Sequence, residues 1–405
     1  MKETSARKAF RAGTHRALPP EETVLRGLRF APIMGITRIA NVTGLDTVGV
    51  PVVTVTRPNS RSVSVSQGKG LDLPTAKASG LMESVETYHA ETITLPLRLA
   101  SYEELRYSYR LADVDELPVT SSGGFHRNSR ILWCEGKDLL NEESVFVPYD
   151  LVHTDYTWPR PAGSECFASS SNGLASGNHL LEAISHGICE VVERDATTLL
   201  RFRARAARES REVDLRTVDE AECCQVLDKF ERAGVGVRVW ETTTDAGIAA
   251  FACEIRDRDH DPMRPIPPAS GMGCHPARSI ALVRALTEAA QSRLTLITGS
   301  RDDLGPDRYT WHREPTVPET EPGRAATRSF RDAPNWDSDT FDDDLEWELD
   351  RLRGAGVSRV IVVNLTKEAF KLPVARVIIP GLEGHHRVPG YVPGKRALAA
   401  AEGAT

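Results

Sequence analysis

The cysteine pattern excludes two common ways of stabilising a protein chain. The sequence has 405 residues and seven cysteines, an odd number, and no two of them stand in a C-x-x-C spacing. We therefore expect neither a disulfide framework nor a thiolate zinc site, and a reducing cytoplasm is the expected compartment.

Long apolar runs and an excess of positive charge are absent as well. No run approaches the ~20 apolar residues that a membrane span requires. The N-terminus carries scattered basic residues but lacks the apolar stretch of a secretory signal. The formal net charge of −7 builds no basic face for nucleic acid or anionic lipid. Neither a membrane nor a nucleic acid is therefore expected as a partner.

Several well-known catalytic and nucleotide-binding motifs are missing too. There is no Walker loop, no G-x-S-x-G and no H-E-x-x-H, and GMGCHP at 271–276 lacks the third glycine of a dinucleotide fingerprint. His15, His89 and His186 stand alone, which is more typical of hydrogen-bonded histidines than of metal ligands. If the chain binds a nucleotide, it does so without a P-loop.

The hydrophobic patterns that are present predict a mixed α/β fold, with α+β sheets covered by helices. Strands are expected at 49–58 and 61–67 as a hairpin, and at 130–140, 144–156, 235–243, 247–255 and 358–366. Helices are expected at 73–92, from 178 onward after a Gly/Ser loop, and at 218–233, 274–299 and 340–356. Residues of about 300–338 are polar and rich in proline, which favours a long mobile loop.

The helix that begins near Asn178 has an unusual acidic face. At 100° per residue, its apolar residues form one stripe, whereas five polar residues fall within ~120° on the opposite side: Asn178, Glu182, His186, Glu190 and Glu193. Only Arg194 stands at i+4 from one of these carboxylates. A solvated face is the ordinary interpretation of such a helix, and a ligand site is the alternative.

The same spacing recurs on two other predicted helices. Ser79-x3-Glu83-x2-Glu86 and Arg284-x3-Glu288-x2-Gln291 match His186-x3-Glu190-x2-Glu193. Carboxylates that converge without basic partners require a cation, and all-oxygen ligation indicates Mg2+ or Ca2+ rather than zinc. Because Mg2+ prefers few carboxylates together with phosphate oxygens, a magnesium–nucleotide site fits best. Basic side chains available for the phosphates are Arg16, Lys69, Arg194 and Arg293.

At these residues the sequence resembles the YcaO family. The matching segments are QGKGLDLPTAKASGLMESVET (67–87), SSSNGLASGNHLLEAISHGICEVVERDA (169–196) and ALTEAAQSR (285–293). They carry the family's S-x3-E-x2-E and N-x3-E-x7-E-x2-E-R patterns and its Gln/Arg helix. Weaker similarity covers most of residues 10–385. One departure is Thr87, where many members have arginine, and it leaves one possible phosphate or carboxylate contact unfilled.

The resemblance implies a YcaO-type ATP-binding fold without a P-loop, together with roles for individual residues. Magnesium is then held by Glu83, Glu86, Glu190 and Glu193. ATP is contacted by Arg16, Lys69, Ser79, Asn178, Glu182, Arg194, Gln291 and Arg293. No general base is assigned. The implied organisation is an N-terminal segment (1–48), a catalytic domain (49–385) and a flexible tail (386–405).

The resemblance also implies an activity, in which ATP and Mg2+ activate a peptide backbone amide by phosphorylation. The opening GTHR and GITRIANVTGLDTVGVPV look most like family members associated with a TfuA partner. That likeness favours a thioamide product, with sulfide or a sulfur carrier as donor, a peptide or protein substrate, and a homodimer. Azoline formation at Cys, Ser or Thr of a precursor peptide is the first alternative. A non-catalytic nucleotide-binding or sulfur-trafficking accessory, and a phosphohydrolase without a peptide substrate, stay open.

Overall fold

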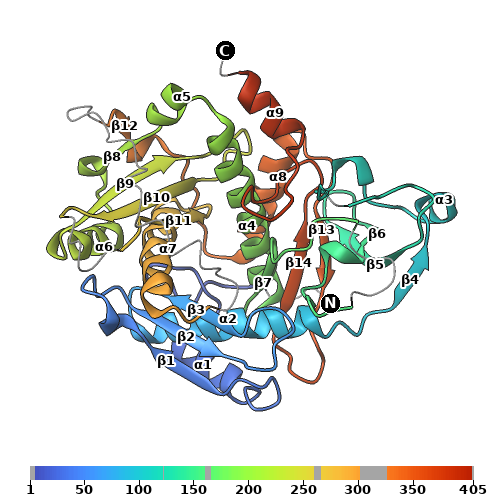
Figure 1. Cartoon of the computed structure of the whole chain (residues 1–405), viewed down its shortest axis with the longest axis horizontal. Helices are drawn as coiled ribbons and strands as arrows, with labels where there is room; N and C mark the ends of the chain where they lie inside the picture. Colours follow the sequence, from blue (N-terminus) through green and yellow to red (C-terminus); the bar gives the residue numbers. More distant parts are fainter. Residues whose placement is uncertain (1–4, 122, 160–165, 260–265, 302–325, 404–405) are drawn as a thin grey trace.

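The structure is a computed structural model, and it describes residues 5–121, 123–159, 166–259, 266–301 and 326–403. Figure 1 shows a three-stranded and a six-stranded sheet on either side of helix α4 (Leu180–Phe202), with the three-stranded N-terminal sheet beneath them. The architecture is the mixed α/β class that the hydrophobic patterns predict. Within these described ranges, no helix is long and apolar enough to cross a membrane.

The N-terminal sheet holds the predicted hairpin and carries a covering helix. Its strands β1 (Arg38–Asn41), β2 (Val52–Thr56) and β3 (Val65–Lys69) pair antiparallel in that order. Helix α2 (Leu73–Glu91) begins at Asp72, whose side chain accepts the N–H of Thr75 at 2.8 Å. Helix α2 packs on this sheet, and α1 (Pro20–Leu28) packs on α2. Since β1 pairs with β2, one sheet contains residues from both sides of the boundary predicted at 48.

A second antiparallel sheet carries helix α7 (Arg278–Thr298) on its face. It consists of β11 (Ala269–Cys274), β10 (Ala250–Asp257) and β9 (Val235–Glu241), in that order. A Cβ at Gly271 would lie 2.2 Å from the carbonyl oxygen of Ala285, and one at Gly273 would lie 2.0 Å from that of Ala281. Glycine is therefore required where α7 crosses β11 so closely. Beside this sheet lie α6 (Ala221–Arg232) and the parallel pair β8 (Val213–Asp214) and β12 (Arg328–Ser329).

The third sheet has six strands and reaches from the centre of the molecule to its edge. Its order is β4 (Leu97–Ala100), β5 (Ile131–Asp138), β13 (Ile361–Asn364), β14 (Val374–Ile378) and β7 (Leu174–Ser176), while β6 (Glu143–Pro148) pairs with β5. Helix α4 packs between this sheet and α8 (Phe341–Gly354). Buried apolar side chains form three main clusters, one around each end of the molecule and one around α4.

Two sequence-based expectations differ from the structure or fall outside it. The tail predicted over 386–405 is not loose where it is described, because α9 (Lys395–Glu402) packs on α4. Arg396 binds Asp195 of α4 at 2.9 Å, and Glu383 accepts the N–H groups of Gly394 and Ala397. The loop predicted over 300–338 falls mostly at 302–325, outside the described residues.

Candidate functional site

A cavity of about 810 Å³ lies where α2, α4 and α7 meet, and residues of β3, β7 and the segment 385–389 also line it. The three helices carry the three copies of the spacing found in the sequence, so the repeated pattern marks one shared site. Six glutamates line the cavity, and they are Glu83 and Glu86 on α2, Glu182, Glu190 and Glu193 on α4, and Glu288 on α7.

The α2 wall presents two carboxylates that no cation pairs directly among the described side chains. Glu86 accepts the backbone N–H of Ser176 at 2.9 Å and its hydroxyl at 2.7 Å. Burial raises the pKa of Glu83 to about 7, although the charges of Arg301 and Lys69 lower it. Burial likewise raises the pKa of Glu86 to about 8, and the charges of Glu83 and Glu190 add to this rise. Near neutral pH Glu86 is therefore mostly protonated and Glu83 is about half protonated, and a bound cation would displace these protons.

The α4 wall is buried rather than solvated. Glu182 is 2% exposed and Glu193 is 3% exposed, so the solvated-face interpretation does not hold. Arg194 lies between two carboxylates, 3.5 Å from Glu190 and 3.6 Å from Glu193. Burial raises the pKa of Glu193 to about 7 in spite of this neighbour. The single positive charge of Arg194 is thus shared by two carboxylates, and it compensates neither of their charges fully.

The cations that the acidic helix lacks in its own sequence come from other elements. Lys69 at the end of β3 binds Glu288 at 2.6 Å. Burial alone would raise the pKa of Glu288, but Lys69 and Arg194 lower it. Arg284 of α7 donates to Nε2 of His186 at 2.8 Å. Burial and this guanidinium hold the pKa of His186 well below its usual range, so the imidazole is neutral and already occupied as an acceptor.

Glu182 and Asn178, both predicted to contact ATP, line the cavity and also hold the N-terminal segment in place. Oε2 of Glu182 accepts the N–H groups of Ala17 at 3.0 Å and Asn178 at 3.2 Å. The Glu182 carboxylate lies 3.6 Å from Arg16. The side-chain amide of Asn178 donates to Thr23 at 2.9 Å. Through these bonds the start of α4 brings Arg16 to the cavity wall.

Of the remaining predicted residues, two line the cavity and one does not. Ser79 and Gln291 are part of its wall. Arg293, in contrast, is 1% exposed and binds Asp46 and Asp257, each at 2.9 Å. The prediction that Arg293 contacts phosphate therefore requires correction, since its guanidinium is buried in an ion pair behind α7. Helical periodicity explains the error, because Arg293 lies two residues, about 200°, beyond Gln291.

Sequence reasoning assigned no role in the site to three groups that the fold brings to the cavity, namely Glu288, Arg284 and Ser176. Glu288 and Arg284 belong to the third copy of the spacing, which was the available signal. Ser176, the partner of Glu86, lies in a Gly/Ser stretch where no pattern distinguishes it. The buried Nε2 of Gln67 also lines the cavity and has no hydrogen-bond partner in the described parts of the chain. A buried, unused donor in a charged cavity is consistent with a polar ligand.

The donor set fits magnesium together with phosphate better than a closed metal cage. In the described residues, no three His, Cys, Asp or Glu side chains converge as a ready-made metal cluster. Mg2+ is commonly held by one or two carboxylates, with substrate phosphates and waters completing its shell. Glu83, Glu86, Glu190 and Glu193 line the cavity and would supply the carboxylates, while Lys69, Arg16 and Arg194 would supply positive charge for phosphate oxygens.

Comparison with known proteins agrees with this geometry. Residues 67–383 match a family model described as YcaO cyclodehydratase, ATP- and Mg2+-binding. The chain is 38% identical, over 91% of its length and 88% of the relative's, to an uncharacterized protein in the tfuA 3′ region of Rhizobium leguminosarum bv. trifolii. It is 36% identical to an uncharacterized protein of Methanothermobacter thermautotrophicus, over 91% and 94% of the two lengths.

Two solved structures share the fold. YcaO from Methanopyrus kandleri, bound with AMPPCP and Mg2+, matches with a TM-score of 0.72 and 24% identity over 96% of this chain and 99% of that one. A heterocyclase in complex with substrate and cofactor matches with a TM-score of 0.77 and 25% identity over 95% of this chain. The present chain spans only 54% of that heterocyclase.

The raised pKa values predict how stability depends on pH. The carboxyl pKa of Glu86 is about 8 in the folded chain, whereas an exposed glutamate has a pKa of 4.5, so folding favours its protonated form. Its contribution to the free energy of unfolding is complete below pH 4.5 and is lost as the pH rises through about 8. Glu86→Gln, measured by urea unfolding, should gain about 4 kcal/mol over wild type between pH 5 and pH 8.5. A difference that does not change with pH would contradict this burial-driven shift.

The corrected position of Arg293 predicts a structural phenotype. Arg293→Met leaves buried Asp46 without its partner and should lower the free energy of unfolding by about 3–5 kcal/mol. Lys69→Met is the matched control, since the same change at the cavity wall should weaken ATP binding while affecting folding less. Urea unfolding and calorimetric ATP titration separate the two effects. Normal stability with weakened ATP binding in Arg293→Met would restore the phosphate role.

Proposed function

Because this chain belongs to the YcaO family, whose members bind ATP and Mg2+, we propose that it activates a backbone amide of a peptide and that its product is a thioamide. The observation that carries the proposal is the cavity in which buried carboxylates with raised pKa values face Lys69, Arg16 and Arg194. An ATP-dependent enzyme that modifies peptides is the class to which the family belongs.

The residues of the cavity divide into two groups by charge. Glu83, Glu86, Glu190 and Glu193 hold Mg2+ and give up their protons as it binds. Lys69, Arg16 and Arg194 orient the phosphates, while Ser79, Asn178 and Gln291 contact the rest of the nucleotide. Bound ATP with Mg2+ supplies the phosphoryl group that turns the amide oxygen, a poor leaving group, into a good one.

The sulfur and its delivery distinguish the proposed reaction from other family chemistry. In thioamide formation the amide oxygen leaves as phosphate and a sulfide equivalent takes its place on the carbonyl carbon, with ADP as the second product. Support comes from the relative that is encoded in a tfuA 3′ region and matches 91% of this chain. We propose a TfuA-like partner protein that supplies sulfur or substrate, and a homodimer as the working assembly.

Azoline formation is the second candidate. It is favoured by the similarity, over 95% of this chain, to a heterocyclase solved with substrate and cofactor. In that reaction a Cys, Ser or Thr side chain of the peptide replaces the external sulfur, and water is lost. A non-catalytic accessory is less consistent with the cavity, because buried carboxylates that are incompletely paired destabilise a fold unless a ligand uses them.

Nucleotide binding is tested by Glu190→Gln. The substitution removes one charge from the α4 wall and conserves the shape of the side chain, so folding should be retained. Magnesium-dependent ATP affinity, measured by calorimetric titration, should fall by about 30-fold or more. Glu346→Gln on the exposed face of α8 is the matched control and should bind as wild type does. Unchanged ATP binding in Glu190→Gln would remove this carboxylate from the site.

The product is tested by mass spectrometry of candidate peptides incubated with the enzyme, ATP, Mg2+ and sulfide. Thioamidation replaces one oxygen by sulfur without changing the other atoms, whereas azoline formation removes one water. We expect the first change, and we expect it to require both ATP and sulfide. Loss of water in the absence of sulfide would establish the heterocyclase alternative instead.

A further inference from the structure

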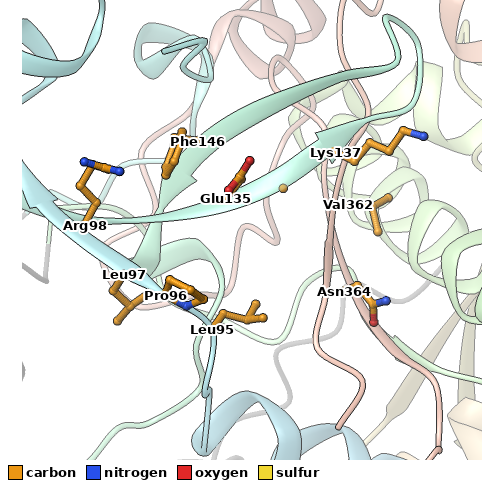
Figure 2. A pocket seen from close by; sticks show the side chains of 10 residues that line it. Leu95, Pro96, Leu97, Arg98, Glu135, Lys137, Phe146, Val362 and Asn364 are labelled. Atoms are coloured by element: carbon orange, nitrogen blue, oxygen red, sulfur yellow. The ribbon is translucent and has the colours of Figure 1, made fainter. Parts of the chain in front are cut away.

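The six-stranded sheet is split on one side of β5. Along that edge, β4 pairs with Ile131–Cys134 and β13 pairs with Lys137 and Asp138. Glu135 and Gly136, between them, have no strand partner there within the described chain. A cavity of about 380 Å³ opens at this point (Figure 2), and we call it the fork.

Hydrogen bonds around β5 show which way the main chain of Glu135 points. Its partner in β6 is Phe146, whose own N–H and C=O bind Arg110 and Ala112, each at 2.9 Å, on the side away from β5. Glu135 and Phe146 are therefore a non-hydrogen-bonded pair. Leu139, four residues after Glu135 and just past the end of β5, donates its N–H to the carbonyl oxygen of Val360 at 2.8 Å, toward β13. By alternation, the N–H and C=O of Glu135 both face the fork.

Neither of the two neighbouring strands, β4 and β13, pairs with Glu135. The register that pairs Leu97 with Cys134 would place Pro96 opposite Glu135, and proline has no N–H to donate. On the other side, a Cβ at Gly136 would lie only 3.0 Å from Ile361 Cγ2 and from the carbonyl oxygen of Val362. The close approach of β13 is thus built around glycine, and its pairing with β5 ends at Lys137. In the described residues no main-chain group pairs with the N–H of Glu135, and its C=O accepts only the weak thiol donor of Cys134 at 3.8 Å.

The side chains around the fork form an apolar floor with a cation at each end. Figure 2 shows Leu95, Leu97 and Val362 along the floor, with Arg98 and Lys137 at opposite ends. Both cations are exposed, and neither has an acidic partner in the described residues. Arg98 lies 4.7 Å over the ring of Tyr109, which holds its charge in place. The Glu135 carboxylate also lines the fork, between the two cations, and accepts the hydroxyl of Ser144. Two cations against one carboxylate leave the fork with a positive charge, which favours an acidic segment.

We propose that the fork binds an extended segment of the peptide substrate, outside the residue that is modified, by main-chain pairing with Glu135. Apolar side chains of the segment face the floor, and an acidic one lies near Lys137 or Arg98. This proposal rests on the proposed peptide substrate. Strand β7, whose Ser176 binds Glu86, is three strand intervals from β5, about 15 Å away. An extended chain of roughly five residues spans that distance.

The test uses the full-length protein and a dye-labelled, capped peptide of sequence Thr-Val-Asp-Val-Thr, followed by fluorescence anisotropy. Arg98→Glu/Lys137→Glu should weaken binding by about tenfold and should prefer the same peptide with lysine in place of aspartate. Arg232→Glu on α6, which lies on the far side of the molecule, is the matched control and should bind as wild type does. Binding should also slow hydrogen exchange of residues 132–138.

Main-chain pairing is tested by N-methylation of alternate amides in two complementary peptides. Only one of them places its methyl groups toward β5, so one should lose binding while the other keeps it. Equal binding by both peptides, or by wild type and the charge-reversed variant, would overturn the proposal, as would absence of binding to wild type. Dissociation of a dimer on adding the peptide would instead identify the fork as an interface between copies of this chain.

The proposed peptide site at the fork and the proposed nucleotide site can be tested independently. Calorimetric ATP titration of Arg98→Glu/Lys137→Glu should match wild type, because neither residue lines the α2–α4–α7 cavity. Failure of the peptide to bind, with ATP binding intact, overturns the fork and leaves the proposed function standing. Peptide binding at the fork in a protein that binds no ATP would overturn the proposed function and leave the fork as a peptide site.

Discussion

Desolvation of carboxylates at the junction of three helices is the constraint on which this structure depends. Each helix brings glutamates to one cavity, and each buried carboxylate destabilises the fold unless charge or protons offset it. The offset comes from distant parts of the chain, with Lys69 on β3 bound to Glu288 and Arg16 bound to Glu182. The sheets and helices must therefore assemble together, because no single helix tolerates its own acidic face when it is buried.

The cations in the cavity are occupied before any nucleotide arrives, and this has a consequence for binding. Lys69 and Arg194 already contact carboxylates, so phosphate oxygens must compete with Glu288 and Glu190 for them. Glu83, Glu86, Glu190 and Glu193 are the carboxylates that would hold Mg2+, and its charge would offset theirs, so that Lys69 and Arg194 would be available to phosphate. Nucleotide and Mg2+ should therefore bind cooperatively, because the metal offsets the carboxylate charge and the nucleotide offsets the charge of the basic side chains.

Local pattern predicted the helices α2, α4 and α7 and the shared spacing on them, because helical periodicity is a short-range property. The sequence indicated too few basic partners for the acidic helix, because only residues within four positions on the same helix were compared. Lys69 and Arg284 come from other elements and lie outside that range. Strand β11 was missed because Gly271 and Gly273 obscure its pattern, and those glycines are what allow α7 to approach. The position of Arg293 depends on which side of α7 packs against Asp46, and this long-range contact cannot be predicted from the spacing of residues along one helix.

The proposed peptide substrate requires a recognition site that is separate from the site where the amide reacts. Every residue of a peptide offers the same backbone amide, so a site that reads only the reacting group has little basis for choosing among positions. Selectivity must come from contacts elsewhere on the peptide, at a fixed distance from the reacting amide. The fork and β7 belong to one hydrogen-bonded sheet, and the sheet holds that distance constant. A segment paired at Glu135 would therefore present one amide, several residues away, to the carboxylate-lined cavity.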